Sequence, residues 1–435
     1  MATASSSRPL RSRAVARNYF GTDGVRGIVG EFITVGLLER LGKASALWSG
    51  RGRVFVGRDT RGSGEELEEA FARGVASAGG SAVLAGVVPT PAVALLGLDL
   101  GVVITASHNP PDYNGVKFFD SNGHKLSDAA EEEIEALLDA PVTGGGEIDH
   151  VDIAVDSYLE HVLERFGSDL SGLRVVVDCA NGAYSEIAPR AFVELGADVE
   201  SIGNEPNGAN INVGCGATDL AALQQTVKSG GFDLGVAFDG DGDRMLAVDE
   251  NGAVVDGDQI VAILALHLGV DLVAVTTMTN LGFHRLMEAR GVRVVTTDVG
   301  DRYVLEALYR EGGILGGEQS GHVICLRDHV TGDGLAAALL LCEALRGRTL
   351  SEAAGAMDRY PQAKRNLPRS GRGPLPQALL DRIEDVNGEL NGDGRVLVRP
   401  SGTEPVVRVL AEAQTEEEAE ALCARIASLV TQELG

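Results

Sequence analysis

The sequence predicts an α/β protein of four compact units, three of which resemble one another. Short runs of β-branched residues alternate with helical runs from residue 53 to about residue 360, an order typical of parallel α/β layers. Similar blocks recur at a spacing of roughly 100 residues, so we expect an internal structural repeat. After Pro361 the alternation stops, and two β-rich runs with a closing helix indicate a smaller α+β unit.

The elements of each block can be assigned in order. In the first block we expect strands at 53–57, 81–87 and 101–107 and helices at 65–79 and 128–140. In the second we expect helices at 154–166 and 183–196 and strands at 173–179 and 234–238. In the third we expect helices at 258–269, 283–290 and 302–310 and strands at 272–276 and 292–297. The last block has a linker or ordered crossing segment at 364–376, strands at 395–399 and 406–413, and a helix from about Thr415. A Gly-rich break at 143–147 helps to place the domains at 18–150, 151–252, 253–362 and 363–435.

The composition limits the class of partner. The chain of 435 residues has 37 Lys and Arg against 63 Asp and Glu, a net charge of −26. Nucleic acids and anionic membranes repel such a protein, so neither is an expected partner, whereas a small anionic ligand needs only a local cluster of donors. The five cysteines are scattered without a C-x-x-C pair, which is typical of reduced thiols in the cytoplasm. The first 22 residues contain four arginines and no acid, which indicates a tail or start-site extension, or else a targeting segment.

A serine is the first candidate for chemistry. A β-branched run ends at Ser107, and Pro110 restricts the residue before it to extended geometry, so a loop follows. Ligands bind at the carboxyl ends of strands in parallel α/β layers, which would offer Ser107 at a loop tip. His108 and Lys117 are then possible proton carriers or phosphate partners. The alternative is a capping serine in an ordinary Asn-Pro turn.

Three alternating carboxylates form the second candidate. Asp239, Asp241 and Asp243 are separated by glycines, so the backbone can fold tightly and bring the three carboxylates to one hard cation. An EF-hand is excluded because Arg244 stands where that loop needs Gly and the flanking runs are strand-like. A divalent-metal site is preferred over a solvated acidic turn, since three such charges without a metal would repel one another.

Two further loops offer recognition groups. The run 316–324 presents Glu318 and Ser320 between glycines, which suits binding of polyol hydroxyls, although such a run can also be a plain turn. The run 398–409 offers guanidinium forks, hydroxyls and free backbone N–H groups, and this set suits an anion. Its candidate ligands are Arg399, Ser401, Gly402, Thr403 and Arg408. The alternative is a surface turn between two strands.

In this order, the segments resemble the α-D-phosphohexomutase superfamily, and within it most closely the phosphoglucosamine mutases. The resemblance rests on YFGTDGVRG (19–27), TASHNP, DGDGDR, GGEQSGH and RPSGTEPVVRV, and it extends from Tyr19 to about Ala413. The opening motif, the Gln of GEQSGH and VGDRYV (299–304) carry the narrower assignment. The run GCGATD departs from the usual pattern, because Ala217 precedes Thr218 where Ser-Thr is common.

The resemblance implies three similar α/β domains and a smaller C-terminal α+β domain around a central cleft. It implies that Ser107 is phosphorylated, that Mg²⁺ is held by this phosphoserine with Asp239, Asp241 and Asp243, and that hexose 1,6-bisphosphate is an activator. The implied reaction interconverts glucosamine 6-phosphate and glucosamine 1-phosphate through a 1,6-bisphosphate, and the product feeds UDP-N-acetylglucosamine synthesis. A homodimer through the first domain and a cytoplasmic location also follow.

The resemblance also suggests roles for individual residues. Arg26, His108 and Lys117 would orient phosphate and move the hydroxyl proton, without a choice among them as general base. Glu318 and Ser320 would bind sugar hydroxyls. The non-reacting phosphate would be held by Arg399, Ser401, Gly402, Thr403 and Arg408.

Three alternatives remain open at this stage. The same mechanism could act on mannose or glucose phosphates. A Mg²⁺-dependent sugar phosphatase could use the Asp loop with water as acceptor. A metal-binding or sugar-phosphate-binding protein without turnover would be indifferent to Ser107→Ala.

Overall fold

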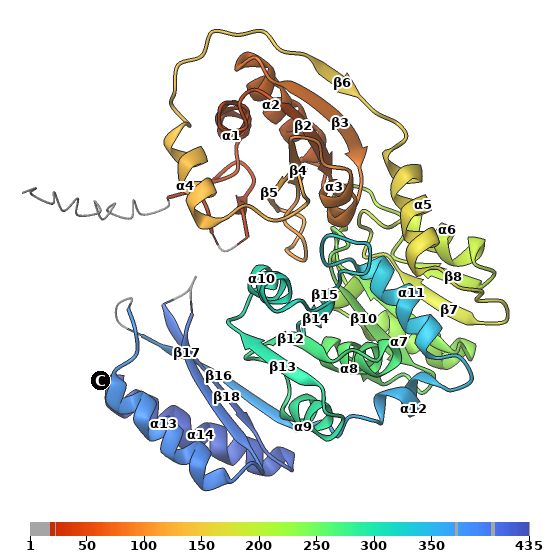
Figure 1. Ribbon diagram of the computed structural model, residues 1–435, viewed down its shortest axis with the longest axis vertical. Coiled ribbons are helices and arrows are strands. Elements are labelled where there is room, and N and C mark those ends of the chain that lie inside the picture. Colours follow the sequence, from red (N-terminus) through yellow and green to blue (C-terminus); the bar gives the residue numbers. More distant parts are fainter. Residues whose placement is uncertain (1–17, 22, 370–372, 402–404, 435) are drawn as a thin grey trace, which may run out of the picture.

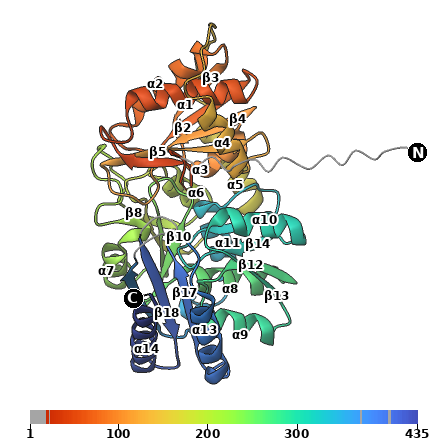
Figure 2. The same ribbon diagram turned by 90° about the vertical axis from the view of Figure 1, so that its left-hand side faces the viewer.

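The computed structural model describes residues 18–21, 23–369, 373–401 and 405–434. Four units follow one another in an arc, and the first and the last face each other across its opening (Figure 1). The view turned by 90° has the first unit at one end of the molecule and the C-terminal unit at the other (Figure 2). The Arg-rich tail lies outside the described residues.

The first unit has a six-stranded sheet in the order β1-β5-β4-β2-β3-β6. Its elements are β1 (Val25–Ile28), α1 (Val35–Trp48), β2 (Arg53–Arg58), α2 (Gly64–Ser77), β3 (Ser81–Val87), α3 (Thr90–Leu96), β4 (Leu100–Ile104), β5 (Tyr113–Asp120), α4 (Asp128–Ala136) and β6 (Ile148–His150). The expected helix 128–140 ends four residues early, at Ala136, and residues 137–139 form turns. β6 follows the Gly-rich break but still pairs with β3, so this sheet continues to residue 150.

The second unit has a five-stranded sheet in the order β11-β10-β9-β7-β8. Its elements are α5 (Ala154–Phe166), β7 (Arg174–Asp178), α6 (Ile187–Glu194), β8 (Asp198–Ile202), the 3₁₀ turn η1 (Gly216–Thr218), α7 (Ala221–Gly230), β9 (Leu234–Phe238), β10 (Met245–Asp249) and β11 (Val254–Val255). The strand β9 is buried along its whole length, as expected of a central strand.

The third unit has a four-stranded sheet in the order β13-β12-β14-β15. Its elements are α8 (Gly257–Leu268), β12 (Leu272–Thr276), α9 (Leu281–Ala289), β13 (Arg293–Thr297), α10 (Asp301–Glu311), β14 (Leu315–Gly317), β15 (Val323–Cys325), α11 (Gly334–Ala344) and α12 (Leu350–Ala354). Ten of the eleven residues of α11 are buried, and this helix packs against α5 and α8 in the largest hydrophobic core.

The expected internal repeat is present as a common strand order. Each of the first three sheets contains three parallel strands and a fourth antiparallel strand at one side, in the orders β5-β4-β2-β3, β10-β9-β7-β8 and β15-β14-β12-β13. The first two strands of each order are antiparallel and consecutive in the chain: β4 and β5, β9 and β10, and β14 and β15. The loop that joins them therefore occupies the same place in all three units.

The C-terminal unit has an antiparallel sheet in the order β16-β18-β17, with two helices. Its elements are β16 (Gln362–Pro368), α13 (Gln377–Leu390), β17 (Arg395–Pro400), β18 (Val406–Glu412) and α14 (Glu416–Leu434). The expectation of a linker at 364–376 is wrong for its first part, because residues 362–368 pair with β18 along their whole length. The charged side chains there hid the strand, since this edge strand exposes Lys364, Arg365 and Asn366.

Candidate active site

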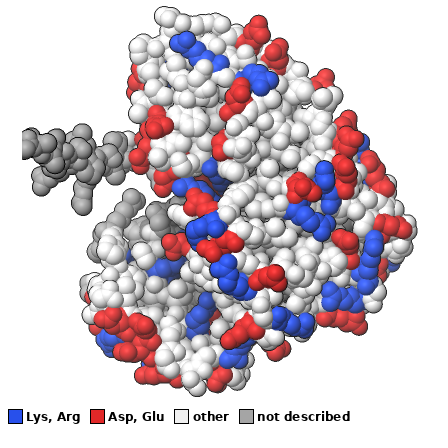
Figure 3. Space-filling view, in the orientation of Figure 1, with Lys and Arg blue, Asp and Glu red and all other residues white. Residues whose placement is uncertain are grey.

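The first three sequence motifs occupy equivalent loops of the three similar units, and the fourth lies in a loop of the C-terminal unit. The loops join β4 to β5, β9 to β10, β14 to β15 and β17 to β18. A hollow opens between the first and the C-terminal unit, and Lys, Arg, Asp and Glu side chains gather at its inner end (Figure 3). The repeat therefore places three chemically different loops at equivalent positions, which local sequence patterns cannot show.

Ser107 lies at the start of the first loop and is buried, with 2% of its surface exposed. Its Oγ donates a hydrogen bond to Asp239 Oδ2 at 2.6 Å and lies 3.3 Å from His108 Nδ1. Its backbone has φ = +50°, a left-handed conformation that costs energy for a residue with a Cβ. The structure thus joins the candidate nucleophile directly to the candidate metal loop.

The three aspartates of the second loop form one cluster. Oxygens of Asp239, Asp241 and Asp243 lie within 4.8 Å of one another, and all three residues are buried. Burial together with the charges of Asp243 and Asp241 raises the pKa of Asp239 to about 8. Asp241 Oδ1 and Asp243 Oδ1 are buried without a hydrogen-bond partner among the described residues. Converging hard oxygen ligands with unsatisfied lone pairs fit a divalent cation such as Mg²⁺.

Lys117 and Arg26 lie beside this cluster. Lys117 Nζ donates to Asp241 Oδ2 at 2.9 Å and to Asp243 Oδ2 at 2.8 Å. Burial favours the neutral amine, but the charges of Asp23, Asp241 and Asp243 raise the pKa of Lys117 well above its usual value. Arg26 donates to Asn109 Oδ1 at 3.2 Å, which places its guanidinium at the serine loop.

His108 differs from these two cations. Burial and the charges of Arg244 and Arg26 lower the pKa of His108 to about 4, so its imidazole is neutral at pH 7. A neutral imidazole 3.3 Å from the serine oxygen can accept a proton. The raised pKa of Lys117 keeps it a cation, which suits it to neutralise charge rather than to act as a base.

A ring of alternating charges extends from the metal loop to the first and third units. We call the charge ring the set of Asp23, Lys125, Asp301, His322, Asp243 and Lys117. Lys125 Nζ lies 2.6 Å from both Asp23 Oδ1 and Asp301 Oδ2. His322 lies 3.4 Å from Asp301 Oδ2 and 3.7 Å from Asp243 Oδ1. Lys117 closes the ring at Asp243 and, 3.3 Å away, at Asp23 Oδ2.

The third loop presents its two candidates differently. Glu318 Oε1 accepts a hydrogen bond from Gly300 N at 3.1 Å, and burial with the nearby charge of Asp301 raises the pKa of Glu318. Ser320 is exposed. Gln319, which supported the narrower family assignment, instead contacts β16: its amide donates to Gln362 Oε1 at 3.1 Å and its oxygen accepts from Lys364 at 3.0 Å.

The fourth loop carries paired arginines. Arg399 of β17 and Arg408 of β18 are direct cross-strand partners. Burial and the charge of Arg408 lower the pKa of Arg399, while Asp298 and Glu318 of the third unit act in the opposite direction. Two guanidinium groups in such proximity suit a doubly charged anion. Ser401 is half-buried beside them, and the candidates Gly402 and Thr403 lie outside the described residues.

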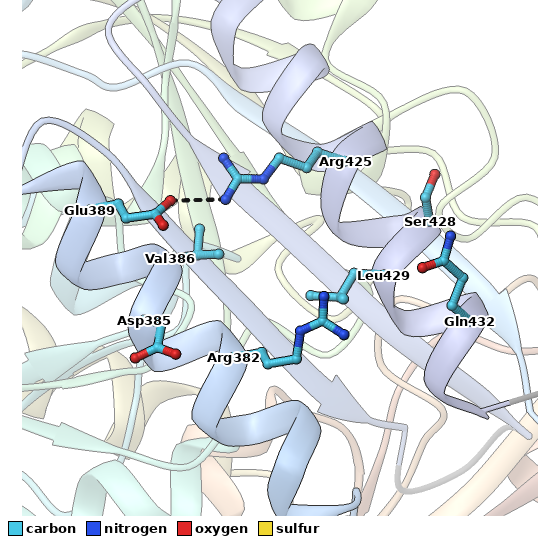
Figure 4. Close-up of a pocket in the computed structure, with 8 residues that line it drawn as sticks. All are labelled: Arg382, Asp385, Val386, Glu389, Arg425, Ser428, Leu429 and Gln432. Atoms are coloured by element: carbon cyan, nitrogen blue, oxygen red, sulfur yellow. Dashed lines mark hydrogen bonds and ion pairs between the residues drawn. The ribbon is translucent and has the colours of Figure 1, made fainter.

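A groove elsewhere on the molecule does not belong to this site. It has a volume of about 440 Å³ and lies between α13 and α14 (Figure 4). Its two arginines are paired within the unit, since Arg425 contacts Glu389 at 3.0 Å and Arg382 contacts Glu433 at 2.6 Å. None of its lining residues belongs to the four loops.

Within the described part of the chain, no helix combines the length and the apolar character needed to cross a membrane.

Comparisons with known protein families agree with the resemblance seen in the sequence. Models of the four domains of the phosphoglucomutase/phosphomannomutase family match residues 17–142, 156–252, 256–360 and 350–429. A phosphoglucosamine mutase of Moorella thermoacetica is 47% identical over 94% of this chain and 99% of its own. A phosphoglucosamine mutase of Thermobifida fusca is 47% identical over 95% of this chain and 98% of its own.

Solved structures have the same fold. A phosphoglucomutase/phosphomannomutase family protein of Burkholderia thailandensis has a TM-score of 0.81 at 26% identity and covers 96% of this chain and 98% of its own. An N-acetylphosphoglucosamine mutase of Aspergillus fumigatus, solved with GlcNAc-6P and magnesium, has a TM-score of 0.70 at 20% identity over 96% of each chain. The chain belongs to the phosphoglucomutase/phosphomannomutase family, within its phosphoglucosamine mutase group.

Proposed function

We propose that the protein is an isomerase that interconverts glucosamine 6-phosphate and glucosamine 1-phosphate through a phosphoserine and a 1,6-bisphosphate. The observation that carries this proposal is the 2.6 Å hydrogen bond between Ser107 Oγ and Asp239 Oδ2 inside a buried carboxylate cluster. Relatives at 44–47% identity over nearly the whole chain are named phosphoglucosamine mutases, which supports the amino sugar as substrate.

The carboxylate cluster supports a divalent cation beside the serine. Asp239, Asp241 and Asp243 would hold Mg²⁺ together with a phosphate on Ser107, and two of their buried oxygens have no hydrogen-bond partner among the described residues. When bound, Mg²⁺ would act as a Lewis acid and offset the charge of about −1.5 to −2 that a phosphoserine adds. Lys117 adds a positive charge at the same carboxylates.

The reaction divides into two phosphoryl transfers at Ser107. In the first, Ser107 gives its phosphoryl group to the free O1 or O6: the Oγ–P bond breaks, a P–O bond to the sugar forms, and the hydroxyl proton passes to a base. His108 is the candidate base because its imidazole is neutral and lies 3.3 Å from Oγ. In the second, Ser107 Oγ takes back the other phosphate of the bisphosphate, and the released sugar oxygen recovers a proton.

Both transfers need the sugar to be held at its far end. The paired Arg399 and Arg408, with Ser401, would bind the non-reacting phosphate, and Gly402 and Thr403 complete the proposed set. Glu318 and Ser320 would bind sugar hydroxyls common to both orientations. Hexose 1,6-bisphosphate would act as activator by loading Ser107 with phosphate.

The decisive experiment is phosphorus NMR with Mg²⁺ and a trace of hexose 1,6-bisphosphate. Glucosamine 6-phosphate, glucose 1-phosphate and mannose 1-phosphate are supplied in parallel to the protein and to Ser107→Ala. We expect rapid formation of glucosamine 1-phosphate by the protein and none by the variant, which loses the phosphate carrier but little packing. Faster turnover of glucose or mannose phosphate would contradict the substrate, and release of inorganic phosphate alone would indicate a phosphatase. Full activity of Ser107→Ala would refute the mechanism.

Three further expectations stay predictions. Family resemblance suggests a homodimer through the first domain. The scattered cysteines suggest a cytoplasmic location, where the product would feed UDP-N-acetylglucosamine synthesis. The sequence pattern suggests domains at 18–150, 151–252, 253–362 and 363–435. Light scattering and limited proteolysis test the first and the last.

A further inference from the structure

The serine loop is held by two side chains that contact neither sugar nor metal in the proposed mechanism. The carbonyl oxygen of Ser107 accepts hydrogen bonds from Arg61 Nη2 at 2.9 Å and from Asn212 Nδ2 at 2.8 Å. The carbonyl oxygen of Asn109 accepts from the same two nitrogens, at 2.8 Å and 3.1 Å. Arg61 belongs to the first unit and Asn212 to the second, so the loop is bound from both sides.

The Arg61 side chain that holds the serine loop is almost fully buried. It is 1% exposed and forms an ion pair with Asp59 at 2.9 Å. Its second terminal nitrogen donates to the carbonyl oxygens of Pro110 and, at 2.9 Å, of Tyr113. A buried guanidinium is costly unless its donors are satisfied, and here most of them bind backbone of the serine loop rather than core side chains. Carbonyl oxygens that converge in this way would repel one another without the cation.

The strained backbone at Ser107 needs such support. A left-handed residue that is not glycine persists only where its surroundings hold it. Below the loop, Thr105 Oγ1 accepts from Ser107 N at 2.9 Å and donates to Asp59 Oδ2 at 2.6 Å. Asp59 therefore supports both Arg61 and the serine amide.

Asn212 also links the serine loop to the metal loop. A Cβ at Gly240, between the first two aspartates of the cluster, would lie 2.8 Å from both Asn212 Nδ2 and the Ser107 carbonyl oxygen. The metal loop therefore packs directly on the bonds that Asn212 makes. The Asn212 side chain therefore lies against both the serine loop and the metal loop.

From these contacts we infer that Arg61 and Asn212 are positioning residues, a two-sided clamp that holds Ser107 in its left-handed conformation over the carboxylate cluster. The clamp binds backbone and not substrate, so it acts equally on both phosphoryl transfers. The inference deepens the proposed function and rests on it for its kinetic test. Loss of the clamp lowers kcat, because the reacting atoms lose their alignment, while the sites for phosphate and sugar are untouched.

The test is the substitution Asn212→Gly, which removes the amide and tolerates the φ of +59° at this position. We expect kcat to fall by about tenfold or more with KM for glucosamine 6-phosphate nearly unchanged, and phosphorylation of Ser107 by glucose 1,6-bisphosphate to slow by the same factor. Amide hydrogen exchange in the peptide 105–113 should become faster. Arg61→Lys, which keeps the charge but loses the fork, should act in the same direction.

Asn210→Gly is the matched control. Asn210 lies in the same loop and its side chain bonds only within it in the described contacts, donating to Glu205 O at 3.0 Å and accepting from Asn207 N at 2.9 Å. Its backbone carbonyl oxygen, which accepts from Asn181 Nδ2 at 3.3 Å, is kept in the glycine variant. It should keep kcat and the exchange of peptide 105–113. Unchanged kcat and exchange in Asn212→Gly, or equal losses in both glycine variants, would overturn the clamp. If the unaltered protein does not turn over glucosamine phosphates, the proposed function fails, and the exchange of peptide 105–113 alone then decides the clamp.

Discussion

Lys125 of the first unit and Asp301 of the third are joined by an ion pair with Nζ and Oδ2 2.6 Å apart. The two side chains are 12% and 19% exposed, so water screens the pair only in part. Through Asp23 and His322 the pair belongs to the charge ring that ends at Asp243 of the metal loop. A chain of ion pairs therefore connects the contact between the first and third units to the proposed metal site.

Lys125→Met should loosen the first unit from the third and lower activity. The substitution leaves Asp23 and Asp301 without their shared cation, and the pKa of each should rise. Because the pair is mostly buried, we expect a loss of roughly 2 kcal/mol in stability, below the value for a fully buried pair. The double variant Lys125→Met/Asp301→Asn should cost less than the sum of the single variants. Thermal unfolding, followed by the fluorescence of Trp48, measures the stability of the single and the double variants. Trp48 is the single tryptophan and lines the groove between these units.

Arg302→Met is the control for this experiment. Arg302 joins the same two units through Asp128 at 2.8 Å but stands outside the charge ring. It should lower stability and leave kcat close to that of the unaltered protein. Strict additivity of Lys125→Met and Asp301→Asn would contradict a coupled pair.

Asp241→Asn should weaken Mg²⁺ binding more than it weakens the fold. The amide can still accept from Thr90 Oγ1, which lies 2.6 Å from Asp241 Oδ2, but it removes one of three anionic ligands. We expect the Mg²⁺ concentration for half-maximal activity to rise by about tenfold or more. Asp249→Asn, at the end of β10 in the same hairpin, is the control and should keep the Mg²⁺ dependence. Identical Mg²⁺ titrations of both variants would refute the metal assignment.

The sequence predicts the reacting groups of the site better than the residues that hold them in position. Ser107 and the three aspartates stand in short loops with Gly or Pro, directly after strand-like apolar runs, and these signals are local. Lys125 and Asp301 are far apart in the sequence, and no local pattern marks either as a partner of the other. Arg61 follows a strand within a charged run that indicates an exposed turn, whereas the folded loop buries it completely. Such roles arise from the packing of units, which single-sequence patterns do not encode.

Asp258 should make the protein less stable as the pH rises. Burial and the nearby charge of Asp256 raise the pKa of Asp258 to about 7, against an ordinary 3.8. Between pH 4 and pH 7 the folded protein keeps this proton while the unfolded chain releases it, so the folded state loses stability across that window. Below it both states are protonated, and above it both are ionised with the full penalty.

Asp258→Asn should remove this contribution. Its amide oxygen can still accept from Asn280 N, which lies 2.8 Å from Asp258 Oδ2. The variant and the unaltered protein should have similar Tm near pH 4, and the variant should become more stable by a few degrees near pH 8. Calorimetry across this range measures the difference. A difference in Tm that does not change with pH would contradict the buried, protonated carboxyl.

Arg408→Ala should raise KM for sugar phosphate far more than it alters the use of Mg²⁺. Arg399 and Arg408 lie side by side across β17 and β18, where a phosphate would offset the repulsion between their charges. A charge-assisted contact of this kind corresponds to about a tenfold or greater change in affinity. The control is Arg365→Ala on β16, whose exposed guanidinium contacts Glu420 at 3.4 Å. Initial rates with both sugar phosphates, and inhibition by inorganic phosphate, measure the effect. An arginine that binds the non-reacting phosphate must affect both substrates. A KM equal to that of the control would therefore remove Arg408 from the phosphate site.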